Sequence, residues 1–196
     1  RAGNPTGATY DNNGQQLTTT NELGGVTTYT YNADGTLADS TDPADNTTTF
    51  EHDVFKRLNR ISRADGTKLD FTHDDANRLL TTTDENDNIS ILTYDINGNL
   101  ETIIDPSGNT SSFTYDENDR ILSTTNRMDG VVSYSFDALG RPETRTDEND
   151  NITSNTYDSL GRLITISFPL GNSNSFTWDA ESVISTASDG LDNTTS

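Results

Sequence analysis

Apolar residues recur along this chain at a fixed spacing. An aromatic ring or an imidazole stands at every twenty-first position, with no insertion or deletion between copies. Another apolar residue, usually Tyr or Phe, precedes most of these rings by two positions, and Leu or Ile follows most of them by six. Such constant recurrence is the signature of a tandem repeat array. The nine ring positions are Tyr10, Tyr31, His52, His73, Tyr94, Tyr115, Phe136, Tyr157 and Trp178.

Polar residues divide each period into two turn signals about half a period apart. The first turn starts directly after the ring and is typified by Asp158–Arg162, with Gly161 fourth and Arg162 fifth. An Asp at the first position of a turn can accept hydrogen bonds from backbone amides, and Gly tolerates a positive φ. The residue after each ring is Asp11, Asn32, Asp53, Asp74, Asp95, Asp116, Asp137, Asp158 or Asp179.

The second turn signal is an Asp-rich block with Pro, Gly and Asn. Its copies include Asp42–Asn46, Asp105–Asn109 and Asp147–Asn151. Pro presets φ for a turn, and we expect Gly or Asn to take the left-handed position in this block.

The segments between the turns are rich in Thr, Ile, Leu, Tyr and Phe, as in Leu163–Ile166. This composition favours strands, and no segment shows helical spacing. Because side chains alternate along a strand, Phe113 and Tyr115 should share one face. The sequence therefore predicts an all-β fold in which each repeat is a two-stranded hairpin. We expect about 18 strands in one continuous antiparallel sheet, which must spiral into a tube or shell because strands twist.

Residues 1–196 are expected to form a single array of about nine repeats. Residues 1–9 match the tail of a preceding copy, with Gly3 and Asn4 at its turn, and residues 178–196 match a copy that lacks its last two positions. One hairpin is too small to fold alone, so neighbouring repeats must supply the missing contacts. We expect the array to be cut within a repeat at both ends from a longer protein.

The composition changes this picture only in what it excludes. Leu, Ile, Val and Phe supply 38 of 196 residues and the net charge is -20, a pairing typical of disorder. The regular placement of the apolar residues argues against that interpretation. A pI near 4.1 argues against nucleic acid as a partner. No apolar run is long enough to span a membrane, and the absence of Cys excludes disulfides and thiolate sites.

The period, the Tyr-Asp pair and the second turn resemble the YD repeat of the Rhs family over the whole chain. The segment Tyr157–Leu163 matches the repeat motif in full. Other copies depart from it, with His52, His73 and Trp178 in place of Tyr, and with Lys56, Asn77, Asp119 and Ser182 in place of Gly. The resemblance implies a spiralling β-sheet wrapped into a hollow shell, as in bacterial polymorphic toxins, insecticidal toxin-complex components and teneurins. In the toxins it implies an enclosed C-terminal effector, which is released by an aspartyl self-cleavage.

No residue pattern points to catalysis. The segment Asp105–Asn109 is superficially similar to the cleavage element of the family, but Asn replaces its Leu and further repeats follow, which favours a turn. His52 and His73 stand at ring positions, where substitution on a sheet face explains them. Neither a Ser-His-Asp set nor a distinguished carboxylate pair is present. We expect no enzyme and no cofactor.

Calcium is the one ligand that the spacing suggests. Asp84–Asn88 and Asp147–Asn151 alternate oxygen-bearing side chains as calcium loops do, and Asp95 and Asp158 fall at the twelfth position of such loops. The sixth-position Gly is replaced by Ile in both. This substitution favours solvated turns, and calcium binding is the alternative. Five Asn-x-Ser/Thr sequons occupy the same turn position, which the repeat itself explains: Asn46, Asn88, Asn109, Asn151 and Asn193.

These observations predict a non-enzymatic structural segment of an Rhs-type shell that encapsulates a toxin or other cargo. An extracellular filament, stalk or adhesin built from the same repeats is the first alternative, and a carbohydrate- or calcium-binding surface is the second. The expected partners are adjacent repeats of the same parent protein and either an enclosed toxin or further copies in a homopolymer. We expect the protein to be secreted or displayed at the cell surface.

Overall fold

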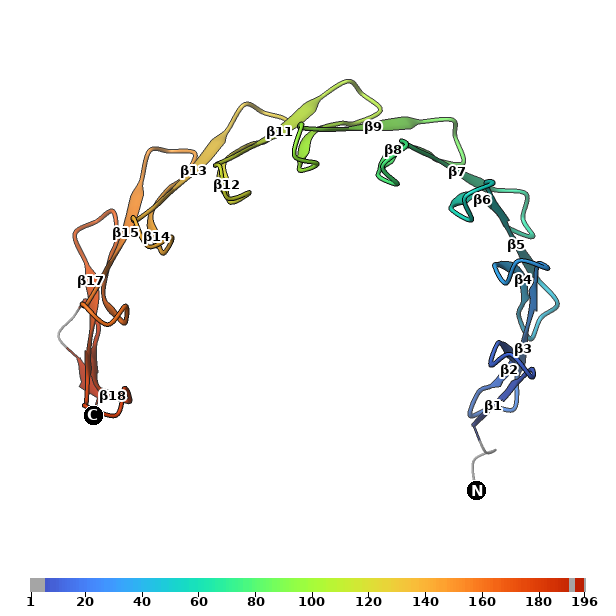
Figure 1. Ribbon diagram of the computed structural model, residues 1–196, viewed down its shortest axis with the longest axis horizontal. Helices are drawn as coiled ribbons and strands as arrows, with labels where there is room; N and C mark the ends of the chain where they lie inside the picture. Colours follow the sequence, from blue (N-terminus) through green and yellow to red (C-terminus); the bar gives the residue numbers. More distant parts are fainter. Residues whose placement is uncertain (1–5, 191–192, 196) are drawn as a thin grey trace. The chain divides into compact units, whose positions relative to one another are not determined.

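The computed structural model describes residues 6–190 and 193–195, and all the regular secondary structure there is β-strand (Figure 1). Nineteen strands form one antiparallel sheet, in which each strand is hydrogen-bonded to the strands before and after it in sequence. The predicted all-β fold of tandem hairpins is confirmed. The turn expected at Gly3 and Asn4 lies outside the described residues.

The strands follow the predicted repeat. Those that end on a ring are β1 (Gly7–Tyr10), β3 (Val26–Tyr31), β5 (Thr47–His52), β7 (Lys68–His73), β9 (Ile89–Tyr94), β11 (Thr110–Tyr115), β13 (Val131–Phe136), β15 (Ile152–Tyr157) and β17 (Ser173–Trp178). Those that follow the first turn are β2 (Gln16–Thr20), β4 (Leu37–Thr41), β6 (Leu58–Ser62), β8 (Leu79–Thr83), β10 (Leu100–Ile104), β12 (Ile121–Thr125), β14 (Pro142–Thr146), β16 (Leu163–Ser167) and β18 (Ile184–Ser188). A further strand, β19 (Thr194–Thr195), pairs with β18.

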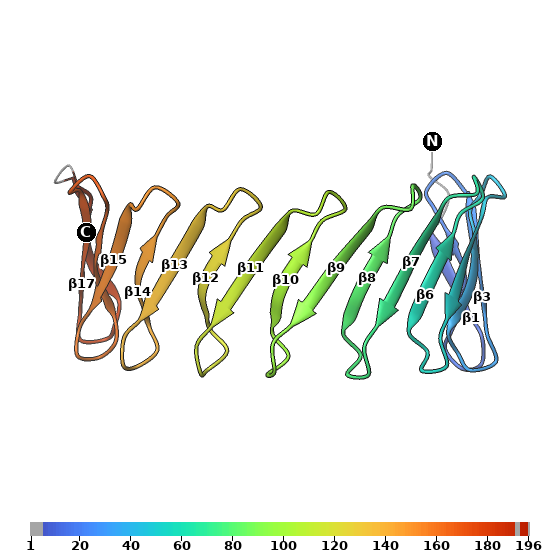
Figure 2. The ribbon, with the colours of Figure 1, turned by 90° about the horizontal axis from the view of Figure 1, so that it is seen from above.

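Two compact units make up the chain: Arg1–Leu92 with Asp105–Ser107, and Thr93–Ile104 with Gly108–Ser196. The first unit holds β1 to β8 and the second holds β10 to β19. Within each unit the strands lie side by side in chain order, and the turns alternate between the two edges of the sheet (Figure 2). The contacts between strands in each unit join consecutive strands. A single array over residues 1–196 stays a prediction.

Both turn signals produce the same five-residue turn. In Asp158–Arg162, the amide of Asp158 donates to the carbonyl of Arg162 (2.9 Å) and the amide of Gly161 donates to the carbonyl of Asp158 (3.0 Å). Gly161 has a φ of +84°. This is a type I turn followed by one left-handed residue. Next to the first turn the strand register also shifts by one residue, between Thr156 and Tyr157, so that Tyr157 pairs with Leu163.

The left-handed residue of the second turn differs in part from the prediction. Gly108 takes this position, as expected, with a φ of +84°. Where Gly is missing, Asp45 (+62°) and Asp150 (+61°) take it, whereas Asn46 and Asn151 stand fifth. The expectation that Asn would be left-handed in these copies is therefore wrong. The fifth residue accepts a hydrogen bond from the first amide with its carbonyl and leads into the next strand, so it needs an extended backbone. The fourth residue is left-handed, and Asp tolerates a positive φ there as Asn does.

None of the described side chains is fully buried, so the sheet is a single layer without a core. Phe113 and Tyr115 are half-buried and Thr114 between them is exposed, which places the two rings on one face as predicted. Small hydroxyl side chains pair across the strands on the opposite face, as in Thr114 with Ser123 (2.7 Å). With no core, stability must come from backbone ladders, turns and side-chain contacts between neighbouring strands.

Candidate functional site

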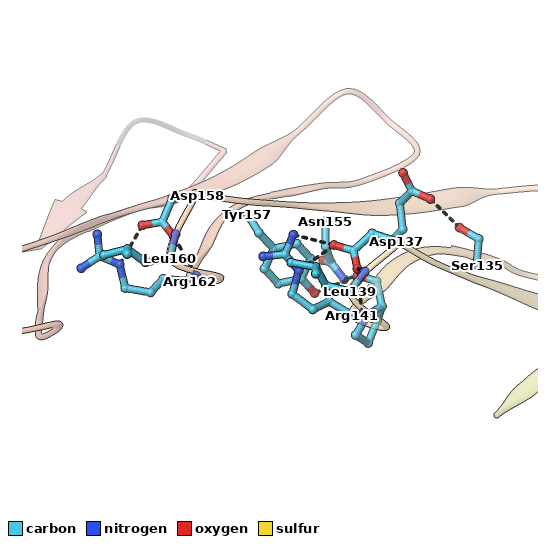
Figure 3. Close-up of polar contacts among 11 residues, drawn as sticks. Ser135, Asp137, Leu139, Arg141, Asn155, Tyr157, Asp158, Leu160 and Arg162 are labelled. Carbon is cyan, nitrogen blue, oxygen red and sulfur yellow. Dashed lines mark hydrogen bonds and ion pairs between the residues drawn. The ribbon is translucent and has the colours of Figure 1, made fainter. Parts of the chain in front are cut away.

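An aspartate holds each typical first turn closed. In the turn after β13, the Asp137 Oδ1 atom accepts the amides of Leu139 and Arg141 (2.9 Å each), while its Oδ2 atom accepts the Arg141 Nε (2.6 Å) (Figure 3). The carboxylate thus uses both oxygens within its own turn. The same three bonds are present or closely matched at Asp53, Asp116 and Asp158. We call this arrangement the aspartate clamp.

The clamp favours the ionised carboxylate. The pKa of Asp137 is lowered, chiefly by the hydrogen bond from the Arg141 side chain and then by the Arg141 amide. At Asp74 the amide of Arg78 is the largest cause of the lowered pKa. Hydrogen bonds to the charged form of an acid produce this direction of shift. The pKa is lowered in the same direction at further aspartates of both kinds of turn, so that the set includes Asp34, Asp42, Asp53, Asp65, Asp74, Asp84, Asp95, Asp116, Asp137, Asp147 and Asp158.

The clamped arginine also reaches into the next repeat. The Arg141 guanidinium lies 4.4 Å from the ring centroid of Tyr157, sixteen residues on (Figure 3). Arg120 lies in the same way over Phe136 (4.2 Å), and Arg162 over Trp178 (5.7 Å). Such cation–π contacts stabilise by about 0.5–1 kcal/mol at exposed sites. Each of these three arginines therefore ties the turn of its own repeat to the ring of the following one, whereas Arg57 lies over Phe55 of its own turn.

The ring adds a polar bond in the opposite direction along the chain. The Tyr157 Oη donates to the carbonyl of Pro142 (2.8 Å), and the Trp178 Nε1 donates to the carbonyl of Leu163 (2.8 Å). Tyr31 bonds to Gln16 and Tyr115 to Leu100 in the same way (2.9 Å each). In each case the acceptor lies fifteen residues earlier, in the preceding repeat. Trp can replace Tyr here because the indole also carries a donor.

Sequence reasoning missed both links between repeats. The sequence places the ring on a strand face and the arginine at the end of the first turn, and neither position indicates a contact with another repeat. One signal was available in the sequence: Tyr and Trp, which carry a donor, hold six of the nine ring positions, while Phe holds one. A preference for a donor on an aromatic ring indicates a hydrogen bond from that ring.

Most second turns use one of two residue pairs, whereas Arg63–Thr67 and Phe168–Asn172 use neither. Where the first residue is Asp, as at Asp147, the fifth is Asn151, and its Nδ2 donates to the Asp147 Oδ2 (3.0 Å). Where the first residue is Asn126, its Nδ2 takes that space and the fifth residue is Gly130. A Cβ atom at Gly130 would lie 2.8 Å from the Asn126 Nδ2. In the turns that begin with Asp or Asn, the identity of the fifth residue therefore follows from that of the first.

This pairing predicts that exchanging both residues is tolerated better than the two single changes suggest. Gly130→Asn should lower the unfolding temperature, because the new side chain meets the amide of Asn126 and the side chain of Glu148. Adding Asn126→Asp should recover part of that loss by recreating the Asp–Asn pair. Thermal unfolding of the two single variants and the double variant measures the coupling. Strictly additive effects would contradict the pairing rule.

A different prediction concerns the left-handed position of the first turn. The Arg141 Nη1 is buried without a hydrogen-bond acceptor, and a Cβ atom at Gly161 would lie 3.4 Å from it. At the equivalent position, the Asn77 Oδ1 accepts the Arg57 Nη1 (3.2 Å). Gly161→Asn should therefore preserve or raise stability, by up to about 1 kcal/mol.

The control for this prediction is Gly161→Val, which supplies no acceptor and places a β-branched residue at a φ of +84°. It should cost about 1–2 kcal/mol or more. Urea unfolding of the three proteins compares them directly. Equal destabilisation by Asn and Val would show that Arg141 gains nothing from the new acceptor.

The calcium-loop interpretation of the second turns is wrong. Asp147 uses its oxygens on Asn149 and Asn151, and the residue at the twelfth position, Asp158, lies beyond the six-residue strand β15. A strand of that length separates the two aspartates by about 20 Å. Among the described residues, no group of three or more His, Asp or Glu side chains could hold a metal ion.

The remaining candidates for chemistry occupy structural positions. Asp105 accepts the amide of Ser107 (2.9 Å) and Gly108 is left-handed, so the segment that resembles a cleavage element forms an ordinary second turn. His52 and His73 end β5 and β7 at the ring position. The polar side chains of this site therefore serve to join one hairpin to the next.

A chain of tandem hairpins, several of them joined to the next by an arginine and a ring, defines a tandem β-hairpin repeat protein. The RHS Repeat family matches residues 31–68, 73–110, 94–127 and 115–152. The chain therefore belongs to the RHS repeat family, which confirms the resemblance seen in the sequence. The comparison with curated protein sequences gives no match.

Solved structures share the fold. The crystal structure of TcdB2-TccC3-Cdc42 is 17% identical, with a TM-score of 0.57 over 95% of this chain and 13% of that chain. The crystal structure of TcdB2-TccC3-TEV is also 17% identical, with a TM-score of 0.55 over the same shares. The chain thus spans about an eighth of the proteins that it resembles. In the part of the chain that the structure describes, no helix is suited to crossing a membrane.

Proposed function

We propose that this chain is a non-enzymatic wall segment of an Rhs-type shell that encloses a toxin or another cargo. The chain is a structural RHS repeat array, and we assign to that array the enclosure of a cargo. The observation that carries the proposal is the direction of its links. Tyr157, Arg141 and their equivalents all join one hairpin to the next, which extends a one-layer sheet by lateral growth.

The two faces of this sheet suit a wall with unlike sides. The rings of Phe113 and Tyr115 lie half-buried on one face, and the Thr114 and Ser123 hydroxyls lie on the other. A protein cargo with apolar surface would find contacts on the ring face, while hydroxyl groups remain well solvated. The shared fold with structures named for TcdB2-TccC3 supports this assignment. The proposal includes a secreted or cell-surface location. The absence of Cys is compatible with that location, because the chain carries no thiol that an oxidising environment could alter.

Electron microscopy and protease protection of the parent assembly, purified from its native source, test the proposal. Closed particles with internal density, and an enclosed chain that becomes protease-sensitive only after the particle is disrupted, are expected. Hollow particles with an equally sensitive enclosed chain would count against enclosure. Turnover of any substrate by the purified array would overturn the non-enzymatic assignment.

An extracellular filament or stalk is the second candidate. The constant period from Tyr10 to Trp178 favours it, because identical steps without insertions generate a regular extended array. Long fibres of the parent protein in the same micrographs would replace the shell with this function.

A further inference from the structure

We infer that the sheet opens one hairpin at a time when it is pulled across its strands, so that the array is an extensible ribbon. This inference does not depend on whether the parent protein forms a shell or a filament. Its basis is the way in which stabilising contacts are distributed through the molecule.

The first step is the connectivity of the sheet. Each strand is hydrogen-bonded to the strands that neighbour it in sequence, and strand contacts within each unit follow the same order. No described residue is fully buried. Detaching an end hairpin therefore breaks one ladder and one set of side-chain links, and leaves every other hairpin with all its contacts.

The second step is the reach of the side-chain links. The Tyr115 Oη bonds to the carbonyl of Leu100, and Arg120 lies over Phe136. Arg141 and Tyr157 make the next link of the same kind. Each link joins one repeat to an adjacent repeat. The aspartate clamps are more local still, since each acts within a five-residue turn. The free energy of opening is thus divided into similar portions, as in one-dimensional repeat proteins.

The third step is the direction of load. Force applied across the strands loads the backbone bonds of the outermost ladder in succession, whereas force along the strands loads all the bonds of a ladder together. A 21-residue repeat spans about 70 Å when extended and about 10 Å across two strands of the sheet. Each opening event should therefore lengthen the chain by about 60 Å.

Optical-tweezers measurements on the second unit test the inference, and the Cys-free sequence allows handles at chosen sites. Handles at Ile96→Cys and Thr195→Cys load β10 to β19 across the strands. We expect successive steps at low force, each of which releases about 60 Å of contour length. Handles at Glu117→Cys and Asn149→Cys, on opposite edges, load β12 to β14 along the strands and should require a higher force. A single rupture of the whole unit, or equal forces in both directions, would overturn the inference.

A variant shows whether opening is local. Arg141→Ala removes one link to the next repeat, together with the arginine bond to Asp137 in its own turn, and should lower the force of one step only. Arg145→Ala, which changes an exposed arginine of β14, is the matched control and should leave every step unchanged. A fall in the force of all steps in Arg141→Ala would show that the hairpins open together, and would also overturn the inference.

Discussion

Tyr157→Ala is expected to make the sheet open more often around β14 to β16, while the remaining repeats keep their stability. The change removes the hydrogen bond from Tyr157 to the carbonyl of Pro142 and the ring beneath Arg141. Removal of a large aromatic side chain from a core costs about 3–5 kcal/mol. Because Tyr157 is half-exposed, we expect the local free energy of opening to fall by about 2 kcal/mol.

Native-state hydrogen exchange is the appropriate measurement, because it reports the opening of each segment separately. A loss of about 2 kcal/mol corresponds to exchange about 30-fold faster. We expect this increase for the amides of β14 to β16 and little change in β11. Uniform acceleration across the second unit would contradict a local effect.

Two further variants separate the stability that comes from the Tyr157 hydrogen bond from the stability that comes from the contact of its ring with Arg141. Tyr157→Phe removes the donor but keeps the ring under Arg141, as Phe136 does naturally beneath Arg120. It should cost about 1 kcal/mol. Leu160→Ala, in the adjoining turn, truncates a side chain that is 73% exposed and should have no measurable effect. If Tyr157→Phe equalled Tyr157→Ala, the contact with Arg141 would contribute nothing.

The sequence predicts the hairpins well because each of their determinants is short-range. Asp158 and Gly161 lie in one turn, and Phe113 and Tyr115 lie in one strand, so their relation follows from local geometry alone. The composition rule for disorder fails for a related reason. In this chain Asp and Asn make the hydrogen bonds of the turns, and Thr pairs across the strands. The polar residues thus form regular structure, so low apolar content does not imply disorder.

The links between repeats could not be predicted, because they depend on which backbone carbonyl or ring a long side chain meets in the neighbouring strand. Spacing alone pairs Arg141 with Asp137, four residues away, and is silent about Tyr157, sixteen residues on. The calcium interpretation failed for the complementary reason. Asp147 and Asp158 have the spacing of loop ligands in sequence, but a strand holds them apart in space.

Acidification below about pH 4 is expected to unfold the protein. The aspartates that clamp the turns have a pKa below the ordinary value of 3.8, as at Asp137 and Asp116, where the arginine side-chain hydrogen bond is the largest cause. A folded-state pKa that is lower than the unfolded one stabilises the fold above the unfolded value. That stabilisation is lost as the pH falls through 3.8 and then through the lower folded values. Circular dichroism of the strands and the fluorescence of Trp178 can follow the transition.

Protonation has an opposing effect that must be separated from the loss of the clamps. The net charge of -20 repels itself at neutral pH, and acid relieves this repulsion. Added salt screens the same repulsion without protonating a carboxylate. We therefore expect salt to raise the unfolding temperature at pH 7 but not to prevent unfolding at pH 3. Asp137→Asn keeps an acceptor for the turn amides while removing the charge, so its repeat should be less stable at pH 7 and less sensitive to acid. A protein that retains its strand signal and its Trp178 fluorescence at pH 2 would show that the ladders alone sustain the sheet and that the carboxylates are dispensable.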